Sequence, residues 1–312
     1  MMRNDRYFRR FDHAFRRNVE MTLFARCRPR YGWPKSSVSD CMPTTRFPRR
    51  HRMQSLPVHR TPHWLNKVPD VALSFWIIKI MSTTVGETGA DFLAVNAGLG
   101  QTVTRIAMAS LLAIALWLQL RTRRYVPWIY WLTVVLVSIV GTQITDLLTD
   151  GLNVSLYAST AAFAVALAAI FFVWHRVEGT LSIDTIVTPR RELFYWAAIL
   201  CTFALGTAAG DLATEALGLG FTLGALCFGG LIAAVFVMWR LGANAVLAFW
   251  IAYILTRPFG ASLGDLLTQA RTYGGLGFGA AWTSLLFLTV IVLLVAVAQF
   301  GSSPRTRAGT AE

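Results

Sequence analysis

Charged and hydroxyl side chains recur every fourth residue along four apolar stretches of the sequence. Residues four apart lie on one face of a helix, so each set forms a polar line. The four lines are Lys79, Thr83, Glu87 and Asp91; Ser138, Thr142, Asp146 and Asp150; Thr207, Asp211 and Glu215; and Arg257, Ala261 and Asp265. Charges at membrane depth are costly and usually face a bundle interior or a watery cavity. The lines predict a carboxylate-lined pathway or a cation site, because oxygen ligands suit hard cations.

A structural role for the repeated aspartates is the competing interpretation. Each carboxylate could accept hydrogen bonds from the N–H groups that open a neighbouring helix. Such helices would begin at four similar turns: Gly98-Leu99-Gly100, Gly151-Leu152-Asn153, Gly218-Leu219-Gly220 and Gly275-Leu276-Gly277. Four equivalent copies favour this structural role.

Three charged residues break the equivalence of the four lines: Lys79, Glu87 and Arg257. At the offsets of Lys79 and Glu87 the other lines have Val134 and Thr142, Ile199 and Thr207, and Tyr253 and Ala261. Because the pattern itself needs no charge there, these three residues are the stronger candidates for transport or binding. Pairing of Lys79 with Glu87, or of Arg257 with an acid, is the structural alternative.

The helices that position these residues belong to an internal repeat. A Trp is followed by a Gly ten residues later and an Asp fifteen residues later, four times: Trp76, Gly86, Asp91; Trp131, Gly141, Asp146; Trp196, Gly206, Asp211; Trp250, Gly260, Asp265. Repeats of this length decide the architecture. The glycines stand in stripes of small residues that let helices approach closely, so the glycines and tryptophans are predicted to mediate helix packing. The repeats cover about 67–124, 125–177, 188–240 and 241–300.

This pattern resembles a family of bacterial membrane proteins built from four tandem two-helix units, each with a Trp. The stretches FWIIKIMSTTVGETGADFL and RPFGASLGDLL carry the resemblance, which covers about residues 68–300. It implies a topology and assigns no activity.

Composition places the chain in a membrane. Of its 312 residues, 55% are apolar and 14% charged, and the mean hydropathy is +0.51. Eight apolar stretches have about the 20 residues needed to cross a bilayer. They are 70–90, 101–120, 127–148, 154–174, 193–213, 218–239, 244–267 and 279–299. We therefore predict an all-α, polytopic membrane protein with eight transmembrane helices in four parallel two-helix repeats.

Basic residues predict the orientation of these spans. Arg121, Arg123 and Arg124 lie between the second and third spans, whereas the alternate connections carry only Arg271. Both termini, including the tail 301–312, are expected on the cytoplasmic side of an inner (cytoplasmic) bacterial membrane. The four aspartates then lie near the outer edge.

The segment 1–66 differs from the rest of the chain in its charge composition. Residues 1–67 hold 16 of the 29 Lys and Arg residues but 4 of the 16 acids. Such composition predicts disorder. A downstream translation start, for example at Met53, is favoured over a lipid-binding arm or nonspecific nucleic-acid binding; no specific nucleic-acid contact is expected.

Signals for catalysis are weak. Intramembrane aspartyl proteases need a Gly-x-Gly-Asp element, which is absent, and no His lies within a predicted span. Neither an enzyme nor a cofactor is predicted; a metal stays undetermined, and so does the oligomeric state. The sequence favours a small-solute or cation transporter in the lipid bilayer, with a non-transporting scaffold or sensor subunit as the alternative.

Overall fold

The protein is all-helical over the residues described by its computed structural model, 66–91 and 100–301 apart from the side chains of Ala90, Asp91 and Gly301. Eight long α-helices follow one another: α2 (Leu73–Asp91), α3 (Gln101–Arg121), α4 (Pro127–Asp146), α5 (Leu156–Glu178), α6 (Pro189–Asp211), α7 (Gly220–Arg240), α8 (Ala245–Thr268) and α9 (Ala280–Gly301). The eight predicted helices are confirmed. The predicted disordered segment and the tail after Gly301 lie outside the described residues.

Short helical turns extend or link these helices. Two π-helical turns, η3 (Leu147–Gly151) and η5 (Leu212–Ala216), continue α4 and α6. Two 3-10 turns, η4 (Ile183–Thr185) and η6 (Arg271–Tyr273), lie in the connections before α6 and α9. The sequence pattern contained no sign of the π turns.

Boundaries differ from expectation mainly at α6 and α5. Helix α6 begins at Pro189, four residues early, because Thr188 caps it by accepting from the Arg191 N–H at 3.3 Å and proline suits a first helical position. Helix α5 continues to Glu178 before Gly179 ends it in a left-handed conformation. His175, expected just beyond a span, therefore lies in the last turn of α5.

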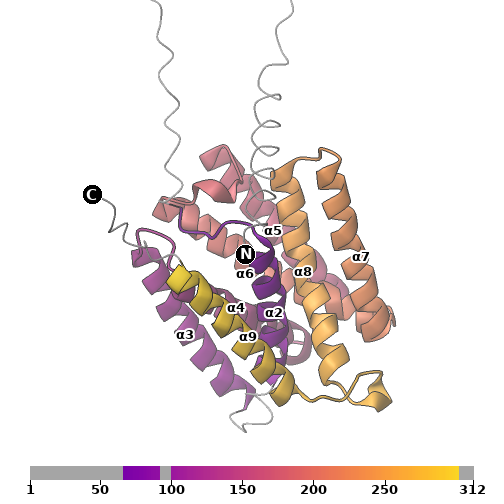
Figure 1. Cartoon of the computed structure of the whole chain (residues 1–312). Coiled ribbons are helices and arrows are strands. Elements are labelled where there is room, and N and C mark those ends of the chain that lie inside the picture. The colour runs from indigo at the N-terminus through magenta and orange to yellow at the C-terminus, as the bar shows by residue number, and fades with distance from the viewer. Residues whose placement is uncertain (1–65, 92–99, 302–312) are drawn as a thin grey trace, which may run out of the picture. The chain divides into compact units, whose positions relative to one another are not determined.

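The even-numbered helices α2, α4, α6 and α8 form an inner ring (Figure 1) in which each packs against the next and α8 closes back on α2. The odd-numbered helices lie outside this ring. Each packs on the inner helix of the following repeat: α3 on α4, α5 on α6, α7 on α8, and α9 on α2. The last repeat thus contacts the first in the way that every repeat contacts its successor.

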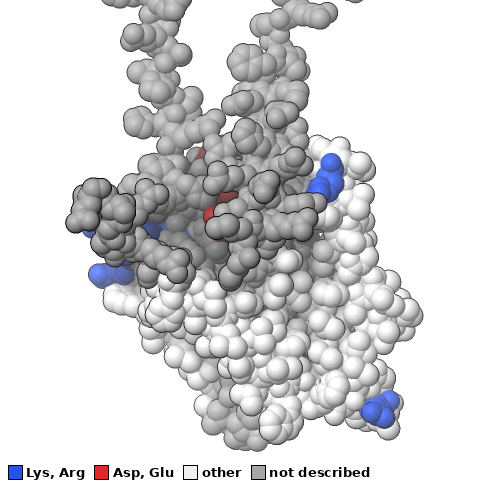
Figure 2. Space-filling view, viewed as in Figure 1, with Lys and Arg blue, Asp and Glu red and all other residues white. Residues whose placement is uncertain are grey.

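Burial separates the two sets of helices. At least half of the residues in the spans of α4, α6 and α8 are buried, against at most 22% in α3, α5, α7 and α9. Figure 2 shows that the described part of one outer face is mostly uncharged and that its few Lys and Arg side chains lie toward its margins. An apolar exterior around a polar interior is what a bilayer requires.

Seven helices in the described part of the chain are long and apolar enough to cross a membrane, and α2 is not among them. Helix α2 carries Lys79 and Glu87, which reduce its hydropathy. Both point into the ring, where Lys79 is fully buried and Glu87 is mostly buried. The chain is a multi-pass membrane protein, and α2 packs against α4, α8 and α9.

The repeated turns share one backbone feature. Their third residue has a positive φ in every repeat: Gly100 (75°), Asn153 (56°), Gly220 (68°) and Gly277 (78°). Glycine and asparagine adopt this left-handed region most readily. Asn153 is the only non-glycine residue with positive φ in the described part of the chain. The third position of the Gly-Leu-Gly pattern therefore has the same left-handed backbone conformation in all four repeats.

Candidate functional site

Four glycines set the spacing of the inner ring. A Cβ built on each would overlap or crowd a side chain of the next inner helix: Gly86 with Ser138, Gly141 with Phe203, Gly206 with Arg257, and Gly260 with Thr83. Ser138, Phe203, Arg257 and Thr83 all stand seven residues after the Trp of their repeat. One contact thus recurs around the ring, and its closeness needs glycine.

Arg257 occupies the centre of the ring. Its Nη2 donates to Glu87 Oε2, to Thr142 Oγ1 and, at 2.7 Å, to Thr207 Oγ1. The Thr142 hydroxyl also donates to Glu87 Oε2 at 3.4 Å. One guanidinium on α8 therefore connects all four inner helices, and it is wholly buried.

The three acceptors occupy one repeat position. Glu87, Thr142 and Thr207 each stand eleven residues after their Trp, where the fourth repeat has Ala261. Arg257 stands seven residues after its Trp, one helical turn earlier, so its long side chain reaches up to the acceptors. Of the two pairings considered from sequence, Arg257 with an acid is the one formed. Lys79 does not pair with Glu87.

Lys79 lies instead between aromatic rings. Its Nζ is 3.5 Å from the centroid of Phe203 and 4.3 Å from that of Tyr253. Ring faces attract an ammonium but offer no lone pair. The Nζ has no hydrogen-bond acceptor among the described residues, and neither do Arg257 Nε and Nη1.

The repeated aspartates lie toward the opposite end of the inner helices from the tryptophans. Asp91, Asp146 and Asp211 are the final residues of α2, α4 and α6, and Asp265 lies in the last turn of α8. Asp146, Asp211 and Asp265 are half-buried; the Asp91 side chain lies outside the described residues. This end of the inner helices also carries Asp150 and Glu215 in the π turns, and we call it the Asp end. Its predicted placement on the outer side of the membrane stays a prediction.

Charge connects the Asp end with the central arginine. Asp211 interacts electrostatically with Glu87, Arg257, Glu215 and Asp146. Asp146 and Asp211 directly precede η3 and η5, and π turns in helices occur frequently at functional sites. A second carboxylate thus lies within electrostatic reach of Arg257.

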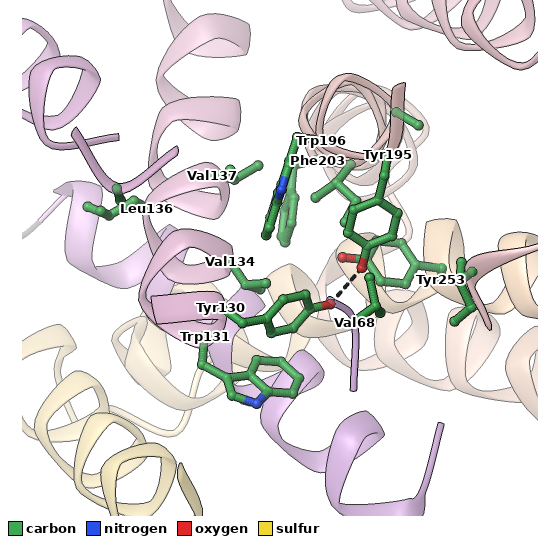
Figure 3. Packing of buried hydrophobic residues seen from close by; sticks show 14 of the residues in the cluster. Val68, Tyr130, Trp131, Val134, Leu136, Val137, Tyr195, Trp196, Phe203 and Tyr253 are labelled. Atoms are coloured by element: carbon green, nitrogen blue, oxygen red, sulfur yellow. Dashed lines mark hydrogen bonds between the residues drawn. The ribbon is translucent and has the colours of Figure 1, made fainter. Parts of the chain in front are cut away.

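The tryptophan ends of the inner helices are packed with aromatic rings. Trp131, Trp196 and Trp250 are buried, whereas Trp76 is partly exposed. The Tyr130 and Tyr195 hydroxyls are hydrogen-bonded at 2.6 Å (Figure 3), near Trp131 and Trp196. The aromatic cluster fills the ring here, so the tryptophans lie mainly inside the protein rather than at a lipid interface.

Tyr125 extends this cluster beyond the spans. It lies before α4, accepts a 3.1 Å hydrogen bond from Trp131 Nε1, and is edge-on to Tyr130. Burial raises the pKa of Tyr125 to about 12. The phenol is therefore neutral at any physiological pH and acts as a hydrogen-bonding group.

Sequence reasoning overlooked one short pattern. Gly260-Ala261-Ser262-Leu263-Gly264 matches the Gly-x-Ser-x-Gly arrangement of a nucleophile elbow. That elbow requires a sharp turn between a strand and a helix, but these residues lie inside continuous α8. Ser262 is buried against Gly224 of α7, so the pattern here is a packing sequence.

Two further observations concern α8 and metals. Helix α8 continues as one helix through Pro258, which packs against Gly206 and Gly210. No group of three or more His, Cys, Asp or Glu residues that could hold a metal ion occurs in the described part of the chain.

Comparison with known proteins gives one match. Residues 74–125, 129–180, 194–242 and 248–301 each match the model of a Repeat of Unknown Function (DUF347). These segments coincide with the four two-helix units inferred from the Trp–Gly–Asp pattern. No curated protein and no solved structure matches.

Proposed function

We propose that this chain, which belongs to the DUF347 repeat family, moves a small polar solute across the membrane through the interior of its inner ring. The observation that supports this most directly is the buried group of Arg257, Glu87, Thr142 and Thr207, which joins all four inner helices. Intramembrane ionisable residues that face a bundle interior commonly mark a solute or ion pathway.

Stability alone is a poor reason for this group. A buried ion pair often stabilises a protein no more than apolar residues of similar volume do. The other repeats carry a Thr or Ala at the offset of Glu87, and an uncharged residue at that of Arg257. A bundle that needed only to be stable could use such residues in all four copies.

Arg257 also has the partners that a gate requires. Glu87 accepts its hydrogen bond, and Asp211 lies within electrostatic reach toward the Asp end. A guanidinium that exchanges one carboxylate for the other would open and reclose the centre of the ring. The aromatic cluster at the tryptophan end closes the other side in the present arrangement.

A bare cation is the less favoured solute. Arg257 places a buried guanidinium at the centre, and the described residues contain no group of three or more His, Cys, Asp or Glu that could hold a metal ion. We therefore narrow the solute to a small polar molecule.

The alternative of a non-transporting scaffold or sensor subunit also has support. Arg257 lies on α8 and hydrogen-bonds to the other three inner helices, so its role could be assembly alone. Flux separates the two: reconstituted wild-type protein should move at least one solute of a broad small-molecule panel into vesicles. Folded protein that moves none would overturn transport and leave the scaffold.

The variant Glu87→Gln sharpens this test. It keeps an acceptor for Arg257 but removes the charge, so flux should fall at least tenfold. Glu178→Gln, at a pair outside the ring whose Arg190 side chain is exposed, is the matched control and should keep wild-type flux. Equal flux in both variants would show that the central ion pair is not part of the pathway.

A further inference from the structure

The centre of the ring has more positive donors than acceptors. Lys79 Nζ, Arg257 Nε and Arg257 Nη1 are buried without an acceptor among the described residues. Buried charged groups are normally paired and hydrogen-bonded, since leaving one unpaired is strongly destabilising. These donors are therefore suited to an acceptor that comes from outside the chain.

A protonated Lys79 and Arg257 would repel each other. Arg257 acts electrostatically on Lys79, and Glu87 is the one carboxylate hydrogen-bonded to either of them in the described structure. Lys79 stays in place through the faces of Phe203 and Tyr253, which hold its Nζ without satisfying its hydrogen bonds. A carboxylate placed between Lys79 and Arg257 would satisfy both.

One helical turn beyond Thr142 and Thr207, toward the Asp end, the ionisable side chains are acidic instead of basic. Asp146 and Asp211 stand four residues beyond Thr142 and Thr207, which is about 6 Å along a helix. Glu215 follows in η5 and interacts with Asp211. Positive groups and carboxylates thus succeed each other at a spacing comparable to the length of a small molecule.

We propose that this site binds a small zwitterion, an amino-acid-like solute whose carboxylate accepts from Lys79 and Arg257 and whose ammonium faces Glu87 and Asp211. A simple anion would satisfy the donors but meet the carboxylates of the Asp end. A simple organic cation would meet Lys79 and Arg257. One solute with both charges complements both halves of the site.

This inference specifies the solute of the proposed transport, but its test measures binding and needs no flux. Full-length protein in lipid nanodiscs is titrated calorimetrically with the common amino acids one at a time, and with acetate and methylammonium at matched ionic strength. At least one amino acid should bind at least tenfold more tightly than acetate or methylammonium.

The variant Lys79→Met is the decisive one. It removes a buried charge from between two rings and retains an apolar side chain of similar length, so the protein should fold. Affinity for the amino acid should fall at least tenfold. Arg105→Gln on α3 is the control, because Arg105 is bonded to Gln101 of its own helix; its affinity should equal that of the wild type.

Several outcomes would overturn the inference. Acetate or methylammonium binding as tightly as every amino acid would show a simple ion site, and folded protein that binds no amino acid would exclude the zwitterion. Unchanged affinity in Lys79→Met would remove Lys79 from the site. Flux of a non-zwitterionic solute alone would refute zwitterion binding and leave the proposed transport intact. Amino-acid binding without any flux would support zwitterion binding and refute transport.

Discussion

Lys67 and Glu192 form a buried ion pair of 2.5 Å although 125 positions separate them in the sequence. Gln119 donates to the other carboxylate oxygen of Glu192 at 3.1 Å, and Lys67 also donates to the Leu120 carbonyl at 3.3 Å. The residues that precede α2, the end of α3 and the start of α6 are thereby joined at the tryptophan end. Nothing in the repeat pattern signals this connection.

Removing one partner of this pair should destabilise the fold. Lys67→Met leaves the Glu192 carboxylate buried with only Gln119, and breaking a buried pair costs roughly 3–5 kcal/mol. We expect the midpoint of unfolding in a denaturing-detergent titration to fall clearly. The double variant with Glu192→Met should recover much of the loss, as neither charge then remains buried. Glu178→Gln, at a 3.7 Å pair whose Arg190 side chain is exposed, should shift the midpoint less than Lys67→Met does.

The ring glycines allow a second stability test. Gly206→Ala places a methyl group against the stem of Arg257, and overpacking of this kind costs typically about 1–3 kcal/mol. Gly230→Ala on α7 is the matched control, since its added methyl meets open space and alanine is the better helix former. Thermal unfolding in detergent should show a lower melting temperature for Gly206→Ala only. A loss of similar size in both variants would contradict the close approach of α6 and α8.

The hydroxyls around Arg257 should matter for flux more than for stability. Thr142→Val and Thr207→Val keep volume but remove acceptors of the guanidinium. Transport should drop about tenfold to a hundredfold, because a hydrogen bond to a charged group contributes roughly 1.5–3 kcal/mol. Thr133→Val and Thr202→Val lie on the same two helices, with described hydroxyl bonds only to their own backbones. If these controls lose as much flux as the ring variants, the guanidinium contacts have no specific role.

Membrane orientation can be checked by cysteine labelling. With the native cysteines replaced, Asn153→Cys and Arg123→Cys each present an exposed thiol at opposite ends of α4. A membrane-impermeant maleimide should label them from opposite sides, and Asn153→Cys from the outside if the basic connections are cytoplasmic. Labelling of both from one side would reject the eight-helix topology.

Helix number and limits were readable from the sequence because hydropathy reports burial in lipid directly. The candidate site was only partly readable. Glu87 and Arg257 stood out because each breaks a fourfold pattern, yet their contact spans 170 positions and depends on which inner helices are neighbours. The shared offset of Glu87, Thr142 and Thr207 was visible in the sequence, but it does not show that one arginine contacts all three.

The position of Lys79 was not predictable from its own helix. A line of residues four apart suggested Glu87 as its partner, whereas Phe203 and Tyr253 of other repeats surround it. Periodicity within one helix states which residues share a face, but it contains no information on the rings that face them. The π turns were not predicted for a similar reason, since hydropathy does not distinguish a π turn from an α-helix.

The packing of α9 on α2 has a consequence for how such a molecule could originate. Because every two-helix unit contacts its successor alike, four identical separate units could close into a cyclic homotetramer. Exact symmetry would then place four equal residues around the axis, either four arginines or four glutamates, which repel one another. Fusion into a single polypeptide lifts that restriction, and one Arg257 can face one Glu87. The covalent joining of the units is what permits opposite charges to meet at their common axis.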